Sequence, residues 1–306
     1  MKKRRAFISF PEQHGSDSNL LSSQKVLDGL NIRFNVKIYS QIGIPAEAYI
    51  SIYNLNREDM QFLTTSAATW MAQQSLIQLY AGYDNDVKCL FSGQIMDAPP
   101  EGFPDLALNI KGISGAEWMS KQIDIQKSNL KMIDLIDYTS SVTGYPVNIP
   151  STLRKTNEVL NKRLENFSYT GSVWNLLDKI QDMTGGFDIG DKSVILSTYN
   201  DNTYVWTPNP TEEGEMLLVS EKTGMIGVPH PTGTGVDVTI LLNPDINTGD
   251  KIYLDSKRVP QCNGIYYVTA IQHEGEIRGN MWQTKLSCSH TANYTKGVDN
   301  EEQITV

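Results

Sequence analysis

The chain has 306 residues, an apolar share of 40%, a charged share of 20% and a formal net charge of −9 at pH 7. This length exceeds the usual size of one domain, so we expect two or three domains whose core needs neither disulfides nor a structural metal. The composition excludes an intrinsically disordered chain, and the acidic balance argues against a general basic grip on nucleic acid.

The cysteines and the two ends of the chain carry little information about function. Cys89, Cys262 and Cys288 form no CxxC pair and no zinc-finger spacing, so we expect three reduced, partly buried thiols in a chain that folds in a reducing cytosol. The basic residues 2–5 precede an apolar stretch too short for a signal peptide and are predicted to form a solvated arm. No run of about 18 apolar residues exists, so no membrane span is expected.

The first third of the chain alternates apolar and polar residues, which is typical of half-buried strands. The strands that this pattern predicts are 31–39, 48–52, 76–80, 90–95 and 106–110. The third and fourth flank the turn-rich segment 83–86 and therefore predict a hairpin. One short helix is expected between residues 54 and 75, with Asn56 as its N-cap.

The middle of the chain has helical patterns instead. Residues 130–138 predict one helix, and Ser172 begins the strongest helical pattern, which Gly185 and Gly186 are predicted to end. A possible capping box lies at 114–117. The remaining prediction is a hairpin whose arms are 187–189 and 194–196. We therefore predict a small α+β middle domain at residues 116–200.

The last third is strand-like again. The strands that it predicts are 236–242, 251–254, 265–272 and 282–288. The first and last thirds have similar strand orders and similar turns, such as Glu101-Gly102 and Glu274-Gly275. We therefore expect an internal duplication, in which two similar antiparallel β domains, 1–115 and 201–290, flank the middle domain. Residues 291–306 are predicted to be a polar tail that frays.

No catalytic fingerprint is present in the sequence. The nucleophile-elbow, zinc-protease and phosphate-loop motifs are absent. The glycine-rich segments 224–227 and 233–235 are predicted to be turns, because a strand rather than a helix follows Gly235. Residues 84–86 lack the glycine and the distal glutamate of a calcium loop. The scattered histidines form no ligand pair, and they are His14, His230, His273 and His290. We predict no catalytic, cofactor-binding or metal-binding residues, no cofactor and no enzyme activity.

Carboxylates and aromatic residues leave two alternatives open. A lytic enzyme needs two acids that face one cleft, and the available acids are Glu101, Glu117, Glu165, Asp178 and Glu274. Nothing in their spacing marks a pair. A carbohydrate- or receptor-binding module needs an exposed aromatic groove, for which Tyr49, Tyr53 and Trp174 are available. Packing or subunit contact is the milder interpretation of these aromatic residues.

Several short motifs carry a resemblance to one protein family. The run 224–229, the motif Leu241-Leu242-Asn243-Pro244 and the motif Gly249-Asp250-Lys251-Ile252 resemble the C-terminal part of baseplate hub proteins of contractile-tailed phages, the tail hub or late control protein D-like superfamily. In the first third, Ile52-Tyr53-Asn54-Leu55-Asn56 and Phe91-Ser92-Gly93-Gln94-Ile95 are similar to the tail-tube-like domain of these hubs. The motif Ser172-Val173-Trp174-Asn175-Leu176-Leu177 fits the insert between two such domains.

The resemblance implies a mainly β protein in which two tail-tube-like antiparallel β-barrel domains flank a small helical domain. It implies a structural hub in the tail baseplate of a virion, assembled in the bacterial cytoplasm. A homotrimer would place six such domains in a ring between a sixfold tail tube or distal tube adaptor above and a threefold central spike below. The other implied contacts are further baseplate proteins and DNA, which would pass through the channel without specific binding. The tail-associated peptidoglycan-degrading enzyme and the stand-alone binding module remain the alternatives.

Overall fold

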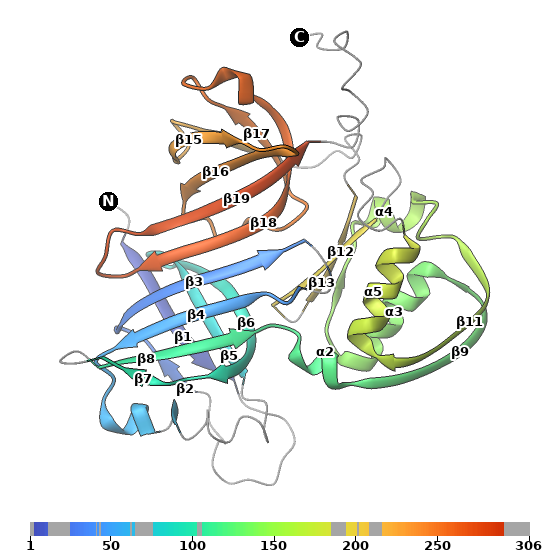
Figure 1. Cartoon of the computed structure of the whole chain (residues 1–306), viewed down its shortest axis with the longest axis horizontal. Helices are drawn as coiled ribbons and strands as arrows, with labels where there is room; N and C mark the ends of the chain where they lie inside the picture. Colours follow the sequence, from blue (N-terminus) through green and yellow to red (C-terminus); the bar gives the residue numbers. More distant parts are fainter. Residues whose placement is uncertain are drawn as a thin grey trace.

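The computed structural model describes a chain built mainly of antiparallel β-strands, with a helical part at one side (Figure 1). The residues that it describes are 3–11, 25–40, 42, 44–61, 63–64, 76–102, 106–184, 194–200, 202–207 and 216–290. Within them, the largest sheet has 14 strands and two smaller sheets have three and two strands. The predicted class is confirmed as mainly β with antiparallel sheets.

The first strand set contains the N-terminal strands of the large sheet. Its members are β1 (Arg4–Phe10), β2 (Lys25–Leu27), β3 (Asn31–Tyr39), β4 (Glu47–Tyr53), β5 (Leu76–Tyr83), β6 (Asp86–Asp97), β7 (Pro100–Glu101) and β8 (Ala107–Ile113). The predicted strands and the hairpin of β5 and β6 are confirmed, and alternate residues such as Ile32 and Phe34 are buried. The predicted helical turn is also confirmed, because the Asp59 amide donates to Asn56 Oδ1 at 2.7 Å.

The second strand set contains the C-terminal strands of the same sheet. Its members are β14 (Leu217–Ser220), β15 (Met225–Pro231), β16 (Gly235–Leu241), β17 (Lys251–Asp255), β18 (Gly264–Glu276) and β19 (Trp282–His290). A 3₁₀ turn, η1 (Pro260–Cys262), precedes β18. All four strands predicted here are confirmed, and the buried face of β19 includes Trp282, Leu286 and Cys288. A strand does begin at Gly235, as expected, but residues 225–227 of the other expected turn belong to β15.

The two strand sets are joined edge to edge. Strand β3 pairs antiparallel with β18, so that Ile38 faces Ile271 and Phe34 faces Gly275. Figure 1 shows β18 beside β3 at this junction. The ring of Phe34 packs edge-on against Trp282, with 5.5 Å between ring centroids. One apolar core therefore continues from one set into the other.

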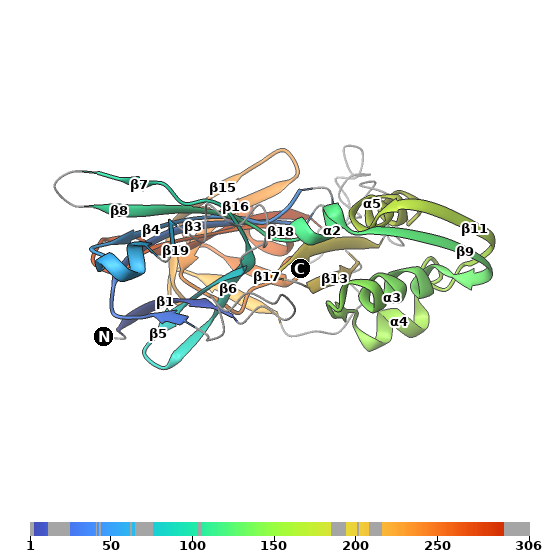
Figure 2. The same ribbon diagram turned by 90° about the horizontal axis from the view of Figure 1, so that it is seen from below.

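Each strand set bends into layers rather than lying flat. In Figure 2, β1 and β5 lie in one layer, β3, β4 and β8 lie in another, and β6 passes between them. Strand β6 makes this possible because its first part pairs with β5 and its last residues pair with β8. Among the described strands, the sheet runs from β15 to β2 without returning on itself. A closed barrel, which we expected, is therefore not seen.

The middle segment has its own core and its own small sheets. Its strands are β9 (Gln122–Lys131), β10 (Val147–Asn148), β11 (Arg163–Ser172), β12 (Ile195–Tyr199) and β13 (Asn202–Trp206). Its helices are α2 (Ala116–Ser120), α3 (Met132–Thr143), α4 (Ser151–Thr156) and α5 (Val173–Met183). Ser172 caps α5 as predicted, accepting from the Asn175 amide at 3.2 Å. The buried faces of α3 and α5 pack into one apolar cluster.

Three predictions for this segment need correction or fall partly outside the described residues. The helix expected at 130–138 begins at Met132, because Leu130 and Lys131 belong to β9, and ends at Gly144, which has φ 78°. Residues 195–196 begin β12, which pairs with β13. The other predicted arm, 187–189, and the glycines 185–186 lie outside the described residues, as do the tail residues 291–306 and the side chain of Glu117 in the expected capping box.

Candidate assembly surfaces

The two strand sets share a pairing register as well as a pairing order. Strands β4 and β16 are each seven residues long. Across β4 and β8, Glu47 faces Ile113 and Tyr53 faces Ala107. Across β16 and β19, Gly235 faces Ser289 and Leu241 faces Gln283 in the same way. Each residue of β4 therefore has a counterpart in β16, and each residue of β8 has one in β19.

The next strands extend this correspondence and include an irregularity. The order β4-β8-β6-β5 in the first set matches β16-β19-β18-β17 in the second. The register slips between Ile95 and Asp97 on β6, and it slips at the corresponding place, between Val268 and Ala270, on β18. A bulge adds a residue and bends its strand, so both long strands turn at the same point.

One side-chain contact is repeated with the backbone. On the second set, Lys285 Nζ donates to Glu274 Oε1 at 3.0 Å. On the first set, Asn109 Nδ2 donates to Glu101 Oε2 at 2.9 Å. These residues are counterparts, because Glu101 faces Ala107 and Glu274 faces Gln283 across their strand pairs. The two Glu-Gly pairs that we compared in the sequence thus occupy matching register positions. Glu274 and Gly275, however, lie within β18 and not in the turn that we predicted there.

The two sets differ at their outer strands. Strand β1 runs antiparallel to β5, whereas β14 runs parallel to β17. The second set also leaves more apolar side chains exposed. Leu218, Tyr253 and Ile265 form one exposed row across β14, β17 and β18, with 44%, 39% and 44% of their surfaces accessible. An exposed row of this kind is more typical of a contact surface than of a free face.

The open face of the joined sheet carries both signs of charge. Its basic residues are Arg33, Lys37, Lys111 and Lys285, and its acidic residues are Glu47, Asp237, Glu274 and Glu276. At the centre, the carboxylate of Glu274 accepts from Lys285 and also from Gln272 and Gln283. Because the charges alternate, this face is neither a basic nor an acidic stripe.

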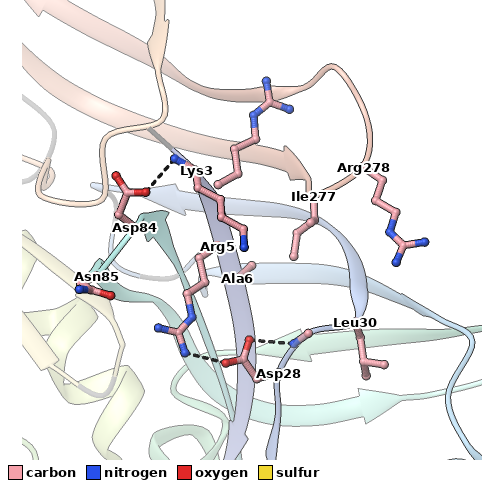
Figure 3. Close-up of a pocket in the computed structure, with 11 residues that line it drawn as sticks. Lys3, Arg5, Ala6, Asp28, Leu30, Asp84, Asn85, Ile277 and Arg278 are labelled. Atoms are coloured by element: carbon pink, nitrogen blue, oxygen red, sulfur yellow. Dashed lines mark hydrogen bonds and ion pairs between the residues drawn. The ribbon is translucent and has the colours of Figure 1, made fainter. Parts of the chain in front are cut away.

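A basic pocket lies where the two sets meet beyond the strand ends (Figure 3). Its volume is about 970 Å³, and residues of β1 and the β18–β19 turn line it. Arg5 pairs with Asp28 at 2.6 Å and holds the pKa of that carboxyl below its usual range. Arg4 Nη1 donates to the Gly279 carbonyl at 2.7 Å, which links the first set to the second.

The predicted solvated arm is therefore wrong for residues 3–5. Arg4 and Arg5 belong to strand β1, which pairs along β5. The Lys3 amide donates to Asp84 Oδ1 at 2.9 Å. The sequence signal that we missed is the apolar run from Ala6 to Phe10, in which Ala6, Ile8 and Phe10 are buried directly after the basic residues.

The candidate catalytic residues do not gather at one site. Glu165 lies exposed on β11 and Asp178 lies exposed on α5, whereas Glu101 and Glu274 lie in different strand sets. His230 is exposed on β15 and His14 lies outside the described residues. His273 is buried, its Nδ1 lies 2.9 Å from Thr284 Oγ1, and burial lowers its pKa to about 3.

The remaining candidates occupy structural positions. Cys262 and Cys288 are buried, Cys89 is half-buried, and no disulfide joins any two of these three cysteines. Tyr49 is exposed and Tyr53 half-buried on β4, while Trp174 is buried in the middle segment. Within the described ranges, no group of three or more His, Cys, Asp or Glu residues is arranged to hold a metal ion. No helix in that part of the chain is both long and apolar enough to cross a membrane.

Comparisons with known proteins agree with this architecture. A family model described as baseplate hub gp41 matches residues 15–288. A search of curated protein sequences returns no match. A tail protein from Neisseria meningitidis has a similar fold, with a TM-score of 0.62 and 9% identity over 94% of this chain and 97% of that chain.

Two further solved structures are similar in fold. The 43 kDa tail protein of prophage MuSo2 from Shewanella oneidensis has a TM-score of 0.58 and 8% identity over 94% of this chain and 98% of that one. A type VI secretion component from E. coli, described as structurally similar to T4 tail proteins gp27 and gp5, has a TM-score of 0.54 and 8% identity over 85% of this chain and 73% of that one. At these identities the likeness concerns the fold alone.

Proposed function

The chain belongs to the baseplate hub gp41 family, and from this premise we propose that three copies form a ring in the tail baseplate of a phage or of a phage-like injection device. The ring adapts a sixfold tail tube, or a distal tube adaptor, to a threefold central spike. It contacts further baseplate proteins and lines the ejection channel. The role is structural and requires no catalysis.

The observation that carries the proposal is the matching register of the two strand sets. Residues 1–115 and 201–290 are then two tube-like domains, 116–200 is a middle domain, and each chain contributes two ring units. Three chains with two units each present six similar edges to the tube above and three whole subunits to the spike below. A duplicated unit in one chain is a direct way to join two rotational symmetries.

The charge distribution supports the proposed passage of DNA without specific binding. If the open sheet face lines the channel, the wall presents alternating charges such as Lys285 beside Glu274. A wall of this kind has no continuous basic stripe to hold the phosphate backbone.

Imaging of the assembled protein tests the proposal. The purified chain, alone and mixed with its tube and spike proteins, is examined by mass photometry and by electron-microscopic class averages. We expect threefold rings with a central channel. Monomers under every condition, with no threefold particle in the presence of both partners, would contradict the ring.

The non-catalytic role has its own measurement. Peptidoglycan is cast into a gel, and the purified chain is renatured in it beside lysozyme as the positive control. We expect no clearing at the band of this protein. Clearing that is lost in Glu101→Gln or Glu274→Gln, but not in Glu165→Gln, would instead establish the lytic alternative.

A further inference from the structure

The junction between β3 and β18 shows how two ring units meet through their backbones. The Ser40 amide donates to the Thr269 carbonyl at 2.8 Å at one end, and the Ile277 amide donates to the Ile32 carbonyl at 3.1 Å at the other. Between these ends the two strands remain in register. Neither strand contains proline, so each amide that points across the junction can donate.

The shared register identifies the edges that correspond to this junction. Val36 faces Ala48, and the counterpart of Ala48 is Val236, which faces Pro231. Strand β15 is therefore the counterpart of β3, and Pro231 is the counterpart of Val36. The outer edge of β15 has no partner among the described strands.

The opposite edge follows from the same reasoning. His273 faces Thr284, and the counterpart of Thr284 is Leu108, which faces Pro100. The run from β6 through β7 is therefore the counterpart of β18, and Pro100 is the counterpart of His273. On the side away from β8, residues 98–101 likewise pair with no described strand.

The prolines stand at the positions whose amides would point outward. The Thr232 amide donates to the Gly235 carbonyl at 2.9 Å, so the backbone polar groups of Thr232 face β16. The backbone of its neighbour Pro231 therefore faces the free edge. The Asn109 amide donates to the Pro99 carbonyl at 3.0 Å, so the backbone of Pro99 faces β8 and that of Pro100 faces the free edge. Each outward proline removes a donor from a free edge.

We propose that neighbouring copies of this chain meet along these two proline-bearing edges, with Pro231 of one copy opposite Pro100 of the next. The inference rests on the proposed ring and adds which strands form its subunit contact. In the chain, Val36 faces His273 across a hydrogen-bonded junction. At the same place between copies, both amide donors are missing, so the contact depends on side chains more than on the backbone.

The side chains next to these prolines are complementary. Asn35 faces Glu274 within the chain. The counterpart of Asn35 is His230, because Asn35 faces Tyr49 and His230 faces Asp237, which are themselves counterparts. His230 of one copy therefore comes opposite Glu101 of the next. Both are exposed in the single chain, and an imidazole N–H can donate a hydrogen bond to a carboxylate.

This arrangement has a consequence for assembly. An open strand edge is a template for uncontrolled pairing, and proline on the edge weakens that pairing. With both free edges weakened in this way, single chains resist open-ended association, while the intact junction of β3 with β18 holds each pair of units together. Ring closure then depends on side-chain contacts and on the partner rings.

Restoring the amides tests the role of the prolines. Sedimentation velocity over a concentration series measures the self-association of the wild-type chain and of the double variant Pro100→Val and Pro231→Val. We expect roughly tenfold tighter association in the variant, because two backbone hydrogen bonds become possible at each contact. Pro150→Val is the matched control, since Pro150 lies in the middle segment. Unchanged or weaker association of a folded double variant overturns the inference.

Cross-linking tests the register without disturbing the prolines. In assembled baseplates carrying Glu101→Cys and His230→Cys, mild oxidation is expected to link neighbouring copies, because facing residues have Cβ atoms about 5 Å apart. The control joins Glu101→Cys with Thr239→Cys, which lies one strand further from the edge. A threefold ring without this cross-link overturns the inference and leaves the ring intact. The absence of any ring contradicts the proposed function itself.

Discussion

The first and second strand sets have the same framework but different surroundings. The pair β4–β8 in the first set has the same register as the pair β16–β19 in the second. A bulge also recurs at the same place on β6 and β18. Yet the position that holds a buried histidine in one set, His273, holds an exposed proline in the other, Pro100. The backbone pattern is thus repeated wherever it builds a unit, while the side chains differ according to whether the edge is joined within the chain or left free.

The largest expected effect is at the joined edge. In Gly275→Ala, the added Cβ would lie 2.3 Å from a ring carbon of Phe34 and 2.9 Å from Trp282. Because this packed ring cannot easily move, we expect a loss of about 3 kcal/mol in the free energy of unfolding, measured with urea. In the control Gly279→Ala, the three atoms nearest to the Cβ all belong to the flexible side chain of Glu276. Equal losses in both variants would contradict a special role for the junction.

Protonation of His273 in the second set should have the next largest effect on the free energy of unfolding. Burial lowers the pKa of His273 from 6.5 to about 3, so the unfolded chain binds this proton more readily between these values. Stability from neutral His273 is therefore present above about pH 6.5 and is lost as the pH falls toward 3. Between pH 7 and 4.5, the free energy of unfolding should therefore fall by about 2 to 3 kcal/mol less in His273→Gln than in the wild type.

Asp250 supplies a control of opposite sign. Burial raises its pKa from 3.8 to about 6, so its unfavourable contribution is present above pH 6 and is relieved as the pH falls through 6 toward 3.8. Asp250→Asn should therefore make acid destabilisation steeper than in the wild type, whereas His273→Gln should make it shallower. The measurement is urea unfolding at several pH values. The same slope in all three proteins would show that neither group governs the response.

Local alternation was sufficient to predict much of both strand sets. Strands such as β3 and β19 bury every second residue, and this pattern is visible in the sequence without knowledge of the partners. Strands β9 and β11 escaped prediction because several successive residues of β9 are exposed and its order comes from pairing with a distant segment. Strand β14 also escaped prediction, because no turn motif in the sequence indicates its parallel pairing with β17.

The assembly surfaces were less predictable than the strands. The comparison of Glu101-Gly102 with Glu274-Gly275 was correct in register, since both glutamates contact counterpart residues. The meaning of Pro100 and Pro231 could not be read from the sequence, because the direction of a backbone amide depends on which neighbour the strand pairs with. Residues 3–5 were misjudged for a related reason. Their charges suggested an arm, but their backbone completes the edge of β5.

The smallest expected effect separates the repeated glutamates. Glu274 is 9% exposed and accepts from Lys285, Gln272 and Gln283, whereas Glu101 is exposed and accepts from Asn109. We expect Glu274→Ala to lower the free energy of unfolding by about 1 to 2 kcal/mol, because it leaves several donors without a carboxylate, and Glu101→Ala by less than about 0.5 kcal/mol. In the assembled ring the difference between the two losses should become smaller, because Glu101 then contacts His230 of the next copy. Thermal unfolding of the single chain and of assembled particles measures both, and a Glu101→Ala change that is equally mild in both forms would separate this residue from the subunit contact.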